Sequence, residues 1–333
     1  MDIKSLLPPI ELELQRQVSR LDAPRTQPFH EMLTYHMGWT GEGAGPEATG
    51  KRIRPILVLL TAASSGTDWQ SALPAAAAIE LVHNFSLVHD DIQDNSPKRR
   101  GRDTAWVKWG APMAINVGDA LFVMSSQAII DLKQKYSADI VLRAAEILHN
   151  TCLELTRGQY LDMSYEKRND ISIEDYWHMI SGKTSALLAA CTQIGALLGG
   201  ADEELQEIYR SYGHYLGLAF QVQDDILGIW GDEKVTGKSA ASDLLEGKKS
   251  LPVLIGLSKK GEFAKRWAQG PIEPEEVDEL SRLLATEGGL IAAQDAAKQM
   301  TDLAMTSLRE ADPQGEAGNA LFELTNKLLN RNQ

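Results

Sequence analysis

Apolar residues recur at intervals of three and four along most of the chain, and few segments alternate with period two. This spacing predicts amphipathic helices rather than strands. The predicted helices cover residues 54–66, 73–94, 111–135, 138–164, 173–199, 203–230, 249–258, 274–286 and 289–310. Because most connections between them are short, the pattern predicts an all-α globule.

Two stretches interrupt the helical pattern. Residues 38–50 contain five glycines and one proline and are predicted to form a loop. Residues 231–249 contain three glycines and four lysines between two apolar segments, which is typical of a surface loop or lid. Since helical segments continue on both sides of each stretch, we predict a single domain over residues 1–333. Two helical lobes are the alternative.

Composition and charge narrow the possible functions. The 333 residues are 43% hydrophobic, which is enough for a large core. The net charge of −13 argues against general affinity for nucleic acid or anionic membranes. Two cysteines, Cys152 and Cys191, cannot form a disulfide framework, so we expect a cytoplasmic protein. The sequence shows neither a secretory signal nor an apolar run of about 18 residues, and no transmembrane segment is expected.

Two aspartate motifs each end a long apolar segment. The first is HDDIQD at residues 89–94, where Asp90 and Asp94 share a helix face. Three neighbouring carboxylates repel one another and, at the C-terminal end of a helix, oppose its dipole. Clustered oxygen donors suit divalent cations, magnesium above all. Asp224 and Asp225 end a second apolar helix, so we expect the two motifs to form facing walls of an acidic cleft.

Cationic motifs accompany the acidic ones. GKRIRP at residues 50–55 opens a helix with Lys51 and Arg54, although cations oppose the dipole at this end. An anion bound there would be held by these cations and by free backbone N–H groups. KRRGR at residues 98–102 directly follows the first aspartates, which favours an anion clamp over a nucleic-acid patch. Further lysines lie in a later helix and in the predicted lid: Lys183, Lys238 and Lys248.

Carboxylates interleaved with cations predict a magnesium–diphosphate site built from helices, because the sequence has no Walker-type glycine loop after a strand. Diphosphate becomes a good leaving group when metal ions and cations neutralise it. The apolar helix before the first aspartates would line a pocket for a hydrocarbon tail. Asp162, in GQYLD at residues 158–162, fits a structural hydrogen bond as well as a role in the site.

In the motifs GKRIRP, HDDIQD, RRG, GQYLD, SGKT and QDD, from about Lys51 to Pro252, the chain resembles the trans-isoprenyl diphosphate synthases, or polyprenyl synthetases. The resemblance implies an isoprenoid synthase fold of mostly antiparallel helices around a deep central cavity, usually in a homodimer. It also implies a prenyltransferase that joins isopentenyl diphosphate to an allylic diphosphate. Ionisation, condensation and elimination follow in turn, and no side-chain nucleophile takes part.

The resemblance also assigns residues. Up to three magnesium ions would bind to the aspartates Asp90, Asp91, Asp94 and Asp224, with Asp225 supporting the second motif. The allylic diphosphate would be held by Arg99, Lys183, Thr184, Gln221 and Lys238, with Lys248 a looser candidate. Isopentenyl diphosphate would be held by Lys51, Arg54, His83 and Arg100. A lone histidine on an apolar helix is usually structural, so His83 rests on the resemblance alone, and Arg331 is a weaker suggestion for the same ligand.

The chain departs from the family pattern at Gly228, where a third aspartate is common, although Asp232 follows. In this family, bulk beneath the first aspartates sets product length. Phe85 lies five residues before Asp90, about 7.5 Å deeper along the helix, and Ser86 beside it is small. These residues resemble those of medium-chain members that make geranylgeranyl diphosphate, with farnesyl diphosphate next.

Two other functions remain as alternatives. A class I terpene cyclase also ionises an allylic diphosphate, but its second motif differs from the one here, and it has no use for GKRIRP. A non-catalytic partner subunit would usually lack one aspartate motif, whereas both are present in this chain.

Overall fold

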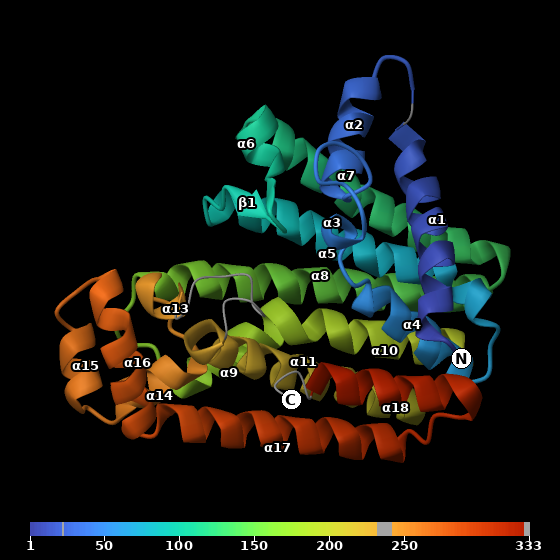
Figure 1. Cartoon of the computed structure of the whole chain (residues 1–333). Helices are drawn as coiled ribbons and strands as arrows, with labels where there is room; N and C mark the ends of the chain where they lie inside the picture. The colour runs from blue at the N-terminus through green and yellow to red at the C-terminus, as the bar shows by residue number, and fades with distance from the viewer. Residues whose placement is uncertain (22, 232–241, 330–333) are drawn as a thin grey trace. The chain divides into compact units, whose positions relative to one another are not determined.

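The structure, a computed structural model, describes residues 1–21, 23–231 and 242–329. Within these ranges the regular structure is helical apart from one short antiparallel hairpin (Figure 1). The predicted all-α class is therefore confirmed.

The chain divides into two compact units. Unit 1 comprises Met1–Asn150, Ala190–Glu207 and Asp312–Leu321. Unit 2 comprises Thr151–Ala189, Ile208–Ala311 and Phe322–Gln333. The single domain expected from the sequence stays a prediction.

Unit 1 is built mainly from the N-terminal elements. These are η1 (Ile3–Leu6), α1 (Leu7–Val18), η2 (Ser19–Leu21), α2 (Gln27–His36), α3 (Pro46–Thr49), α4 (Ile53–Ser64), η3 (Trp69–Ala72), α5 (Leu73–Gln93), β1 (Lys98–Arg99), β2 (Arg102–Asp103), α6 (Ala105–Trp109), α7 (Ala111–Asp131) and η4 (Leu132–Gln134). Four longer helices have residues in both units: α8 (Ala138–Glu166), α10 (Ala186–Leu198), α11 (Glu203–Trp230) and α18 (Gly315–Leu329).

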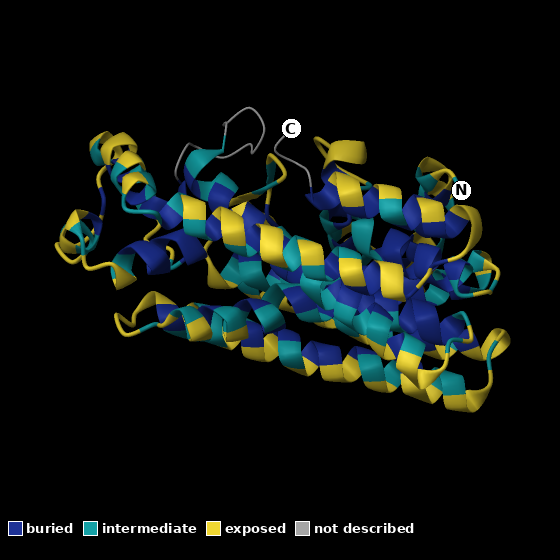
Figure 2. Cartoon of the chain, turned by 90° about the horizontal axis from the view of Figure 1, so that it is seen from below, coloured by how far each residue is buried: buried dark blue, intermediate teal, exposed yellow. Residues whose placement is uncertain are grey.

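Unit 2 contains the remaining elements. These are α9 (Ile173–Ile180), the π-helical turn η5 (Ser181–Ser185), α13 (Ser242–Leu245), α14 (Leu251–Ser258), α15 (Glu262–Trp267), η6 (Pro274–Glu276), α16 (Val277–Thr286) and α17 (Gly289–Glu310). Its core is formed by apolar residues of α9, α11, α14 and α17: Tyr176, Ile180, Leu218, Val222, Leu254 and Ala293. Buried and exposed residues recur along the helices (Figure 2), because the sequence period places apolar residues on one face of each helix.

Helix α5 of unit 1 carries the first aspartate motif at its C-terminal end and packs along α7. The two helices are antiparallel, because residue 85 contacts residue 122 and residue 89 contacts residue 118. A Cβ added at Gly118 would lie 2.2 Å from His89 Nε2. Glycine at this position therefore allows α7 to approach the end of α5 closely.

Each predicted helix corresponds to helical structure, but the sequence pattern did not predict seven further α-helices of the described ranges: α1, α2, α3, α6, α13, α15 and α18. Of these, α3 lies in the stretch predicted to be a loop, and α13 lies in the predicted surface loop or lid. Helices α1 and α2 begin with prolines, which interrupt a periodic pattern and yet fit the first helical turn. Helix α18 begins with glycine-rich sequence, a poor helix former. Its apolar residues at the three-and-four spacing are nevertheless buried, and they were the available signal: Ala320, Leu321, Leu324 and Leu328.

Two helical segments, Trp69–Gln93 and Ala111–Gln134, are long and apolar enough to cross a membrane by length and composition. Their most apolar windows are 61% and 44% buried inside the protein. Core helices of soluble proteins have the same properties, so this finding fits the expected lack of a transmembrane segment without adding to it.

Candidate active site

The first aspartate motif in unit 1 combines one buried carboxylate with two that lie closer to solvent. Asp91 is 2% exposed and forms an ion pair with Arg99, whose Nη2 lies 2.7 Å from Asp91 Oδ1. Burial raises the pKa of the Asp91 carboxyl, and Arg99 opposes that shift. Asp90 is half-buried, and Asp94, the C-cap of α5, is exposed. The helix end thus presents Asp90 and Asp94 toward solvent.

The hairpin after α5 brings the RRG motif to the GKRIRP motif. Arg100 and Gly101 connect β1 to β2 with φ angles of 52° and 76°. Arg100 Nη1 donates a hydrogen bond to the Ala48 carbonyl oxygen at 2.7 Å. Gly50 has a φ of 79°, which favours glycine, and a Cβ added there would lie 2.6 Å from Arg100 Nη2, so glycine leaves room where the guanidinium meets the backbone. The two motifs, separate in sequence, therefore form one cationic cluster.

The GKRIRP segment continues into α4, where Arg54 contacts His83 of α5. Lys51 is exposed, whereas Arg54 is partly buried and donates from Nη1 to His83 Nε2 at 3.2 Å. Burial, together with the arginines nearby, holds the pKa of His83 well below its ordinary value. The ring is therefore neutral, and Nε2 accepts the hydrogen bond. Burial also lowers the pKa of Arg54, whose Nε has no hydrogen-bond partner in the described ranges.

A cavity opens beside this cluster. Its lining includes Arg99, Arg100, Arg102, Asp91, Asn84 and His36. Burial, and then Arg99 and Arg100, lower the pKa of His36 to about 3, so this ring is neutral as well. Three guanidinium groups against the two carboxylates of Asp91 and Asp103 give the cavity a net positive charge, which favours an anion.

The residues predicted to set product length lie within α5. The Phe85 ring packs against Phe122 of α7, with centroids 5.0 Å apart, and edge-on against His89 at 5.3 Å. The Ser86 hydroxyl donates to the His83 carbonyl oxygen at 2.8 Å. Phe85 thus belongs to an aromatic group one to two helical turns before the aspartates.

In unit 2 the GQYLD and SGKT motifs meet. Lys183, in the π-helical turn η5, forms an ion pair with Asp162. Two glycines allow this contact, since a Cβ added at Gly158 would lie 2.1 Å from Lys183 N, and one at Gly182 would lie 2.7 Å from the Glu154 carbonyl oxygen. π-Helical turns occur frequently at functional sites. The sequence did not decide whether Asp162 has a structural role or a role in the site. In the structure it pairs with Lys183, which is predicted to bind the allylic diphosphate.

Asp225 of α11 lies at the centre of a hydrogen-bonded chain. Its Oδ2 accepts from Tyr176 Oη at 2.7 Å and from Leu251 N at 3.0 Å. Its Oδ1 accepts from Gln221 Nε2 at 2.9 Å, and Gln221 Oε1 accepts from Thr184 Oγ1 at 2.7 Å. Burial raises the pKa of Asp225 to about 6 against these hydrogen bonds. Three of the predicted residues are thus joined in one network.

Asp224, the predicted metal ligand of the second motif, is exposed. A Cβ added at Gly228 would lie 2.4 Å from Asp243 Oδ2, so the carboxylate of Asp243 fills the space beside this glycine. Lys248 pairs with Asp243 at 3.5 Å and with Glu246 at 2.9 Å. Three residues named from the sequence lie outside the described ranges: Lys238, Asp232 and Arg331.

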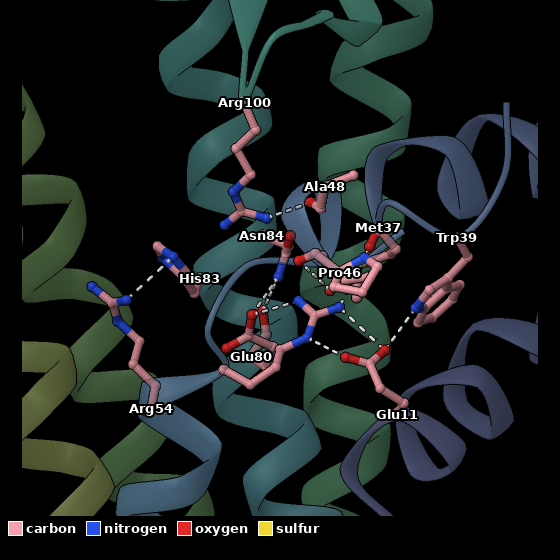
Figure 3. A network of polar contacts seen from close by, with 12 residues as sticks. Glu11, Met37, Trp39, Pro46, Ala48, Arg54, Glu80, His83, Asn84 and Arg100 are labelled. Atoms are coloured by element: carbon pink, nitrogen blue, oxygen red, sulfur yellow. Dashed lines mark hydrogen bonds and ion pairs between the residues drawn. The ribbon is translucent and has the colours of Figure 1, made fainter. Parts of the chain in front are cut away.

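The sequence reasoning missed several polar residues that support these groups. In unit 1 they join Arg52 to α1 and α5, as Figure 3 shows for Glu11, Trp39, Glu80 and Asn84. Glu80 and Asn84 are polar residues four positions apart on an otherwise apolar helix, on either side of His83. Buried polar residues at that spacing need partners, and this was the available signal. Tyr176 and Asp243 had no comparable signal.

The aspartates fit a divalent cation by their donor chemistry. Carboxylate oxygens are ligands that magnesium prefers, and Asp90 and Asp94 lie one helical turn apart near solvent. Asp91 and Asp225, in contrast, are engaged by protein donors. Among the described residues, no group of three or more His, Cys, Asp or Glu side chains is drawn together as a metal site.

Comparisons with known proteins agree with one another. The polyprenyl synthetase family model matches residues 45–285. The chain is 41% identical over 257 residues to a (2E,6E)-farnesyl diphosphate synthase of Mycobacterium tuberculosis, covering 77% of this chain and 69% of that protein. It is 38% identical over 292 residues to a geranylgeranyl diphosphate synthase of the same organism, covering 86% and 83%. A solved polyprenyl synthetase structure from Streptomyces coelicolor matches with a TM-score of 0.87 and 36% identity, covering 98% of this chain and 100% of that one.

Proposed function

Because this chain belongs to the polyprenyl synthetase family, and is a prenyltransferase that elongates prenyl chains on the all-α isoprenoid synthase fold, we propose that it joins isopentenyl diphosphate to an allylic diphosphate. The observation that carries this proposal is the cationic cluster of unit 1, where GKRIRP and RRG meet beside the first aspartates. Two anions must be held for the reaction, and this cluster provides cations for one of them.

Isopentenyl diphosphate binds in unit 1. Lys51, Arg54 and Arg100 supply positive charge for its diphosphate. Neutral His83 accepts from Arg54 Nη1 and so directs the remaining N–H groups of that guanidinium. A guanidinium offers donors in a fixed fork that matches phosphate oxygens, which makes its orientation decisive.

The allylic diphosphate is held by the second group of residues. Lys183, Thr184 and Gln221 belong to the linked networks of unit 2. Arg99, Lys238 and Lys248 complete the set that we propose for this ligand. Asp90, Asp91, Asp94 and Asp224 would hold up to three magnesium ions, which would supply positive charge that neutralises the diphosphate.

The chemistry balances without a side-chain nucleophile. The allylic carbon–oxygen bond breaks, and its electron pair leaves with the diphosphate. The double bond of isopentenyl diphosphate then attacks the allylic cation and forms the new carbon–carbon bond. Loss of a proton to the departed diphosphate gives a product that is longer by one isoprene unit. Lys183 and Arg99 stabilise the leaving group as its charge develops.

The product is of medium length, geranylgeranyl diphosphate, with farnesyl diphosphate as the alternative. Relatives carry both names. The packing of Phe85 against Phe122 supports an aromatic floor below the aspartates. The small side chain of Ser86 leaves room above that floor.

A homodimer in the cytoplasm completes the proposal. Helix α7 exposes large apolar residues, each 44–56% exposed: Met113, Ile115, Val123 and Ile130. A second copy of the chain would cover them. Cys152 and Cys191 are buried and form no disulfide, which suits a reducing compartment. Light scattering on the purified protein measures the mass, and a monomer at micromolar concentration would contradict the dimer.

The reaction is tested by incubating the enzyme with magnesium and labelled isopentenyl diphosphate and with dimethylallyl, geranyl or farnesyl diphosphate in turn. We expect condensation with at least one primer and products resolved by chromatography. Absence of condensation with every primer would reject the proposal.

Product length is tested with Phe85→Ala. Removal of the ring opens the floor, so we expect products longer by one or more isoprene units. Phe29→Ala, on α2, is the control and should leave the product unchanged. Unchanged product length in Phe85→Ala would refute the floor assignment.

A further inference from the structure

Arg52 lies between two predicted ligands of isopentenyl diphosphate, and yet its side chain is only 1% exposed. Its guanidinium donates from Nε to Glu11 Oε1 at 2.6 Å and from Nη1 to Glu80 Oε1 at 2.8 Å. Lys51, its neighbour, is exposed. The neighbouring cations Lys51 and Arg52 therefore have different roles, because the guanidinium of Arg52 is buried and is not available to bind substrate.

The backbone at Arg52 is strained. Arg52 is the N-cap of α4 with φ of 49° and ψ of 36°, the left-handed region that a residue with a Cβ rarely adopts. Such a conformation persists only where surrounding contacts fix it, and it is often found at functional sites. The two carboxylates supply those contacts.

The two ion pairs of Arg52 and one hydrogen bond connect four segments of unit 1. Glu11 belongs to α1, Glu80 to α5, and Arg52 itself to the start of α4. Trp39, in the loop after α2, donates from Nε1 to Glu11 Oε2 at 2.7 Å. Figure 3 shows Glu11 and Glu80 directed toward the same point from their two helices. The network therefore fixes the start of α4 relative to α5.

This register decides where Arg54 lies. Arg52 contacts Glu80, and Arg54 contacts His83, three residues further along the same helix. Residues three apart on a helix share a face, so both contacts depend on the same placement of the start of α4 along α5. Asn84 donates to Glu80 Oε1 at 3.1 Å and orients this carboxylate toward Arg52. Loss of Arg52 would release Glu80 and shift Arg54 from His83.

We propose that Arg52, held by Glu11 and Glu80, is a positioning residue that sets Lys51, Arg54 and His83 for the diphosphate of isopentenyl diphosphate. This inference rests on the proposed function of that cluster. The two carboxylates exceed the single guanidinium by one negative charge. Burial lowers the pKa values of Arg54 and Arg100, and the negative charge of Glu80 opposes that shift and favours their charged forms.

The test separates the two substrates. Arg52→Lys keeps the charge but loses the fork that spans two carboxylates. We expect the KM for isopentenyl diphosphate to rise about tenfold, as for other supporting hydrogen-bond partners, with the KM for the allylic primer changed less than about twofold. Glu11→Gln, at a partly exposed site, should raise the KM for isopentenyl diphosphate about threefold, and Trp39→Phe should raise it less. Arg143→Lys, an exposed pair with Glu203, is the matched control.

The outcomes are distinct. Equal rises in both KM values, or a KM for isopentenyl diphosphate within twofold of wild type, would overturn the inference, because a merely structural residue lowers the amount of active enzyme without this split. If Arg52→Lys does not fold, Glu11→Gln decides in the same way. Calorimetric titration of wild-type enzyme with isopentenyl diphosphate accompanies the series. A wild type that neither binds nor condenses this substrate refutes the proposed function instead.

Discussion

Arg52 in unit 1 and Asp225 in unit 2 are both buried ionisable groups next to residues predicted to bind substrate or metal, and they are held by opposite kinds of partner. Arg52 meets two carboxylates, Glu11 and Glu80. Asp225 meets three neutral donors, from Tyr176, Gln221 and the Leu251 backbone. Arg52 is held by ion pairs of opposite charge, whereas Asp225 is held by hydrogen bonds from neutral groups.

The difference shows how each unit prepares for its ligand. Unit 1 gathers guanidinium groups for an anion and needs buried carboxylates to hold them. Burial, and then the positive field of these arginines, lowers the pKa values of His36 and His83 below their ordinary values. In unit 2 burial raises the pKa of Asp225 to about 6, and no arginine or lysine is among its main partners. Desolvation thus acts on both sites but pushes the pKa values of bases and acids in opposite directions.

The largest expected effect is on stability when the Arg52 guanidinium is removed. Arg52→Met leaves Glu80, which is 3% exposed, without its cation. Removing one partner of a buried ion pair costs about 3–5 kcal/mol, because the other charge stays buried and unpaired. Urea unfolding followed by circular dichroism measures this loss.

The control for that measurement is Arg143→Met, which removes an ion pair of the surface. Exposed pairs contribute at most about 1 kcal/mol, and Arg143 with Glu203 is exposed on both sides. If the two variants lose similar stability, the Arg52 network is not a buried charge pair in the sense argued above.

The second effect is a pH dependence from His36. Burial, and then Arg99 and Arg100, lower its pKa in the folded protein to about 3, against an ordinary value of 6.5. The unfolded chain therefore binds the proton first, so stability is complete above pH 6.5 and falls as pH drops toward 3. Between pH 7.5 and 5 this amounts to about 2 kcal/mol, at about 1.4 kcal/mol for each pH unit below 6.5.

His36→Gln removes this titration, and unfolding free energies at pH 7.5 and 5 measure the change. The variant should lose about 2 kcal/mol less than wild type on acidification, by the same relation. His178→Gln, an exposed imidazole, should behave as wild type. Equal acid sensitivity of wild type and His36→Gln would mean that burial and the nearby arginines do not keep this ring neutral in the folded protein.

The sequence predicted the long helices and the motif residues because both have local signals. The aspartates and arginines of unit 1 stand out by type and spacing, and the structure brings RRG to GKRIRP through the glycine at position 50. The pairing of Arg52 with Glu11 was not predictable in this way. Those residues are 41 positions apart, and nothing local distinguishes Arg52 from the two other cations of its motif.

The two aspartates of the second motif in unit 2 show the same limit of prediction from sequence. Asp224 and Asp225 are identical neighbours in sequence, but one is exposed and the other is buried. The helical period places them about 100° apart, so only one can face the core. Which one does so depends on Tyr176 and Leu251, which come from other helices. The motif predicts two carboxylates, whereas packing assigns their separate roles.

The smallest expected effect on the free energy of unfolding comes from Asp225→Asn, and this variant tests the contrast between Asp225 and Arg52 most directly. The amide keeps an oxygen for Tyr176 and Leu251, which both bind Oδ2. A flip of the Gln221 amide would let its oxygen accept from the new NH2 group while its nitrogen donates to Thr184 Oγ1. Each contact of residue 225 then keeps its partner, and only the hydroxyl hydrogen of the partly buried Thr184 loses Gln221 as its acceptor, so the free energy of unfolding should change by about 1 kcal/mol at neutral pH. Urea unfolding beside Arg52→Met gives the direct contrast, since a loss as large as that of Arg52→Met would show that the negative charge of Asp225, and not its hydrogen-bond geometry, holds α11 in place.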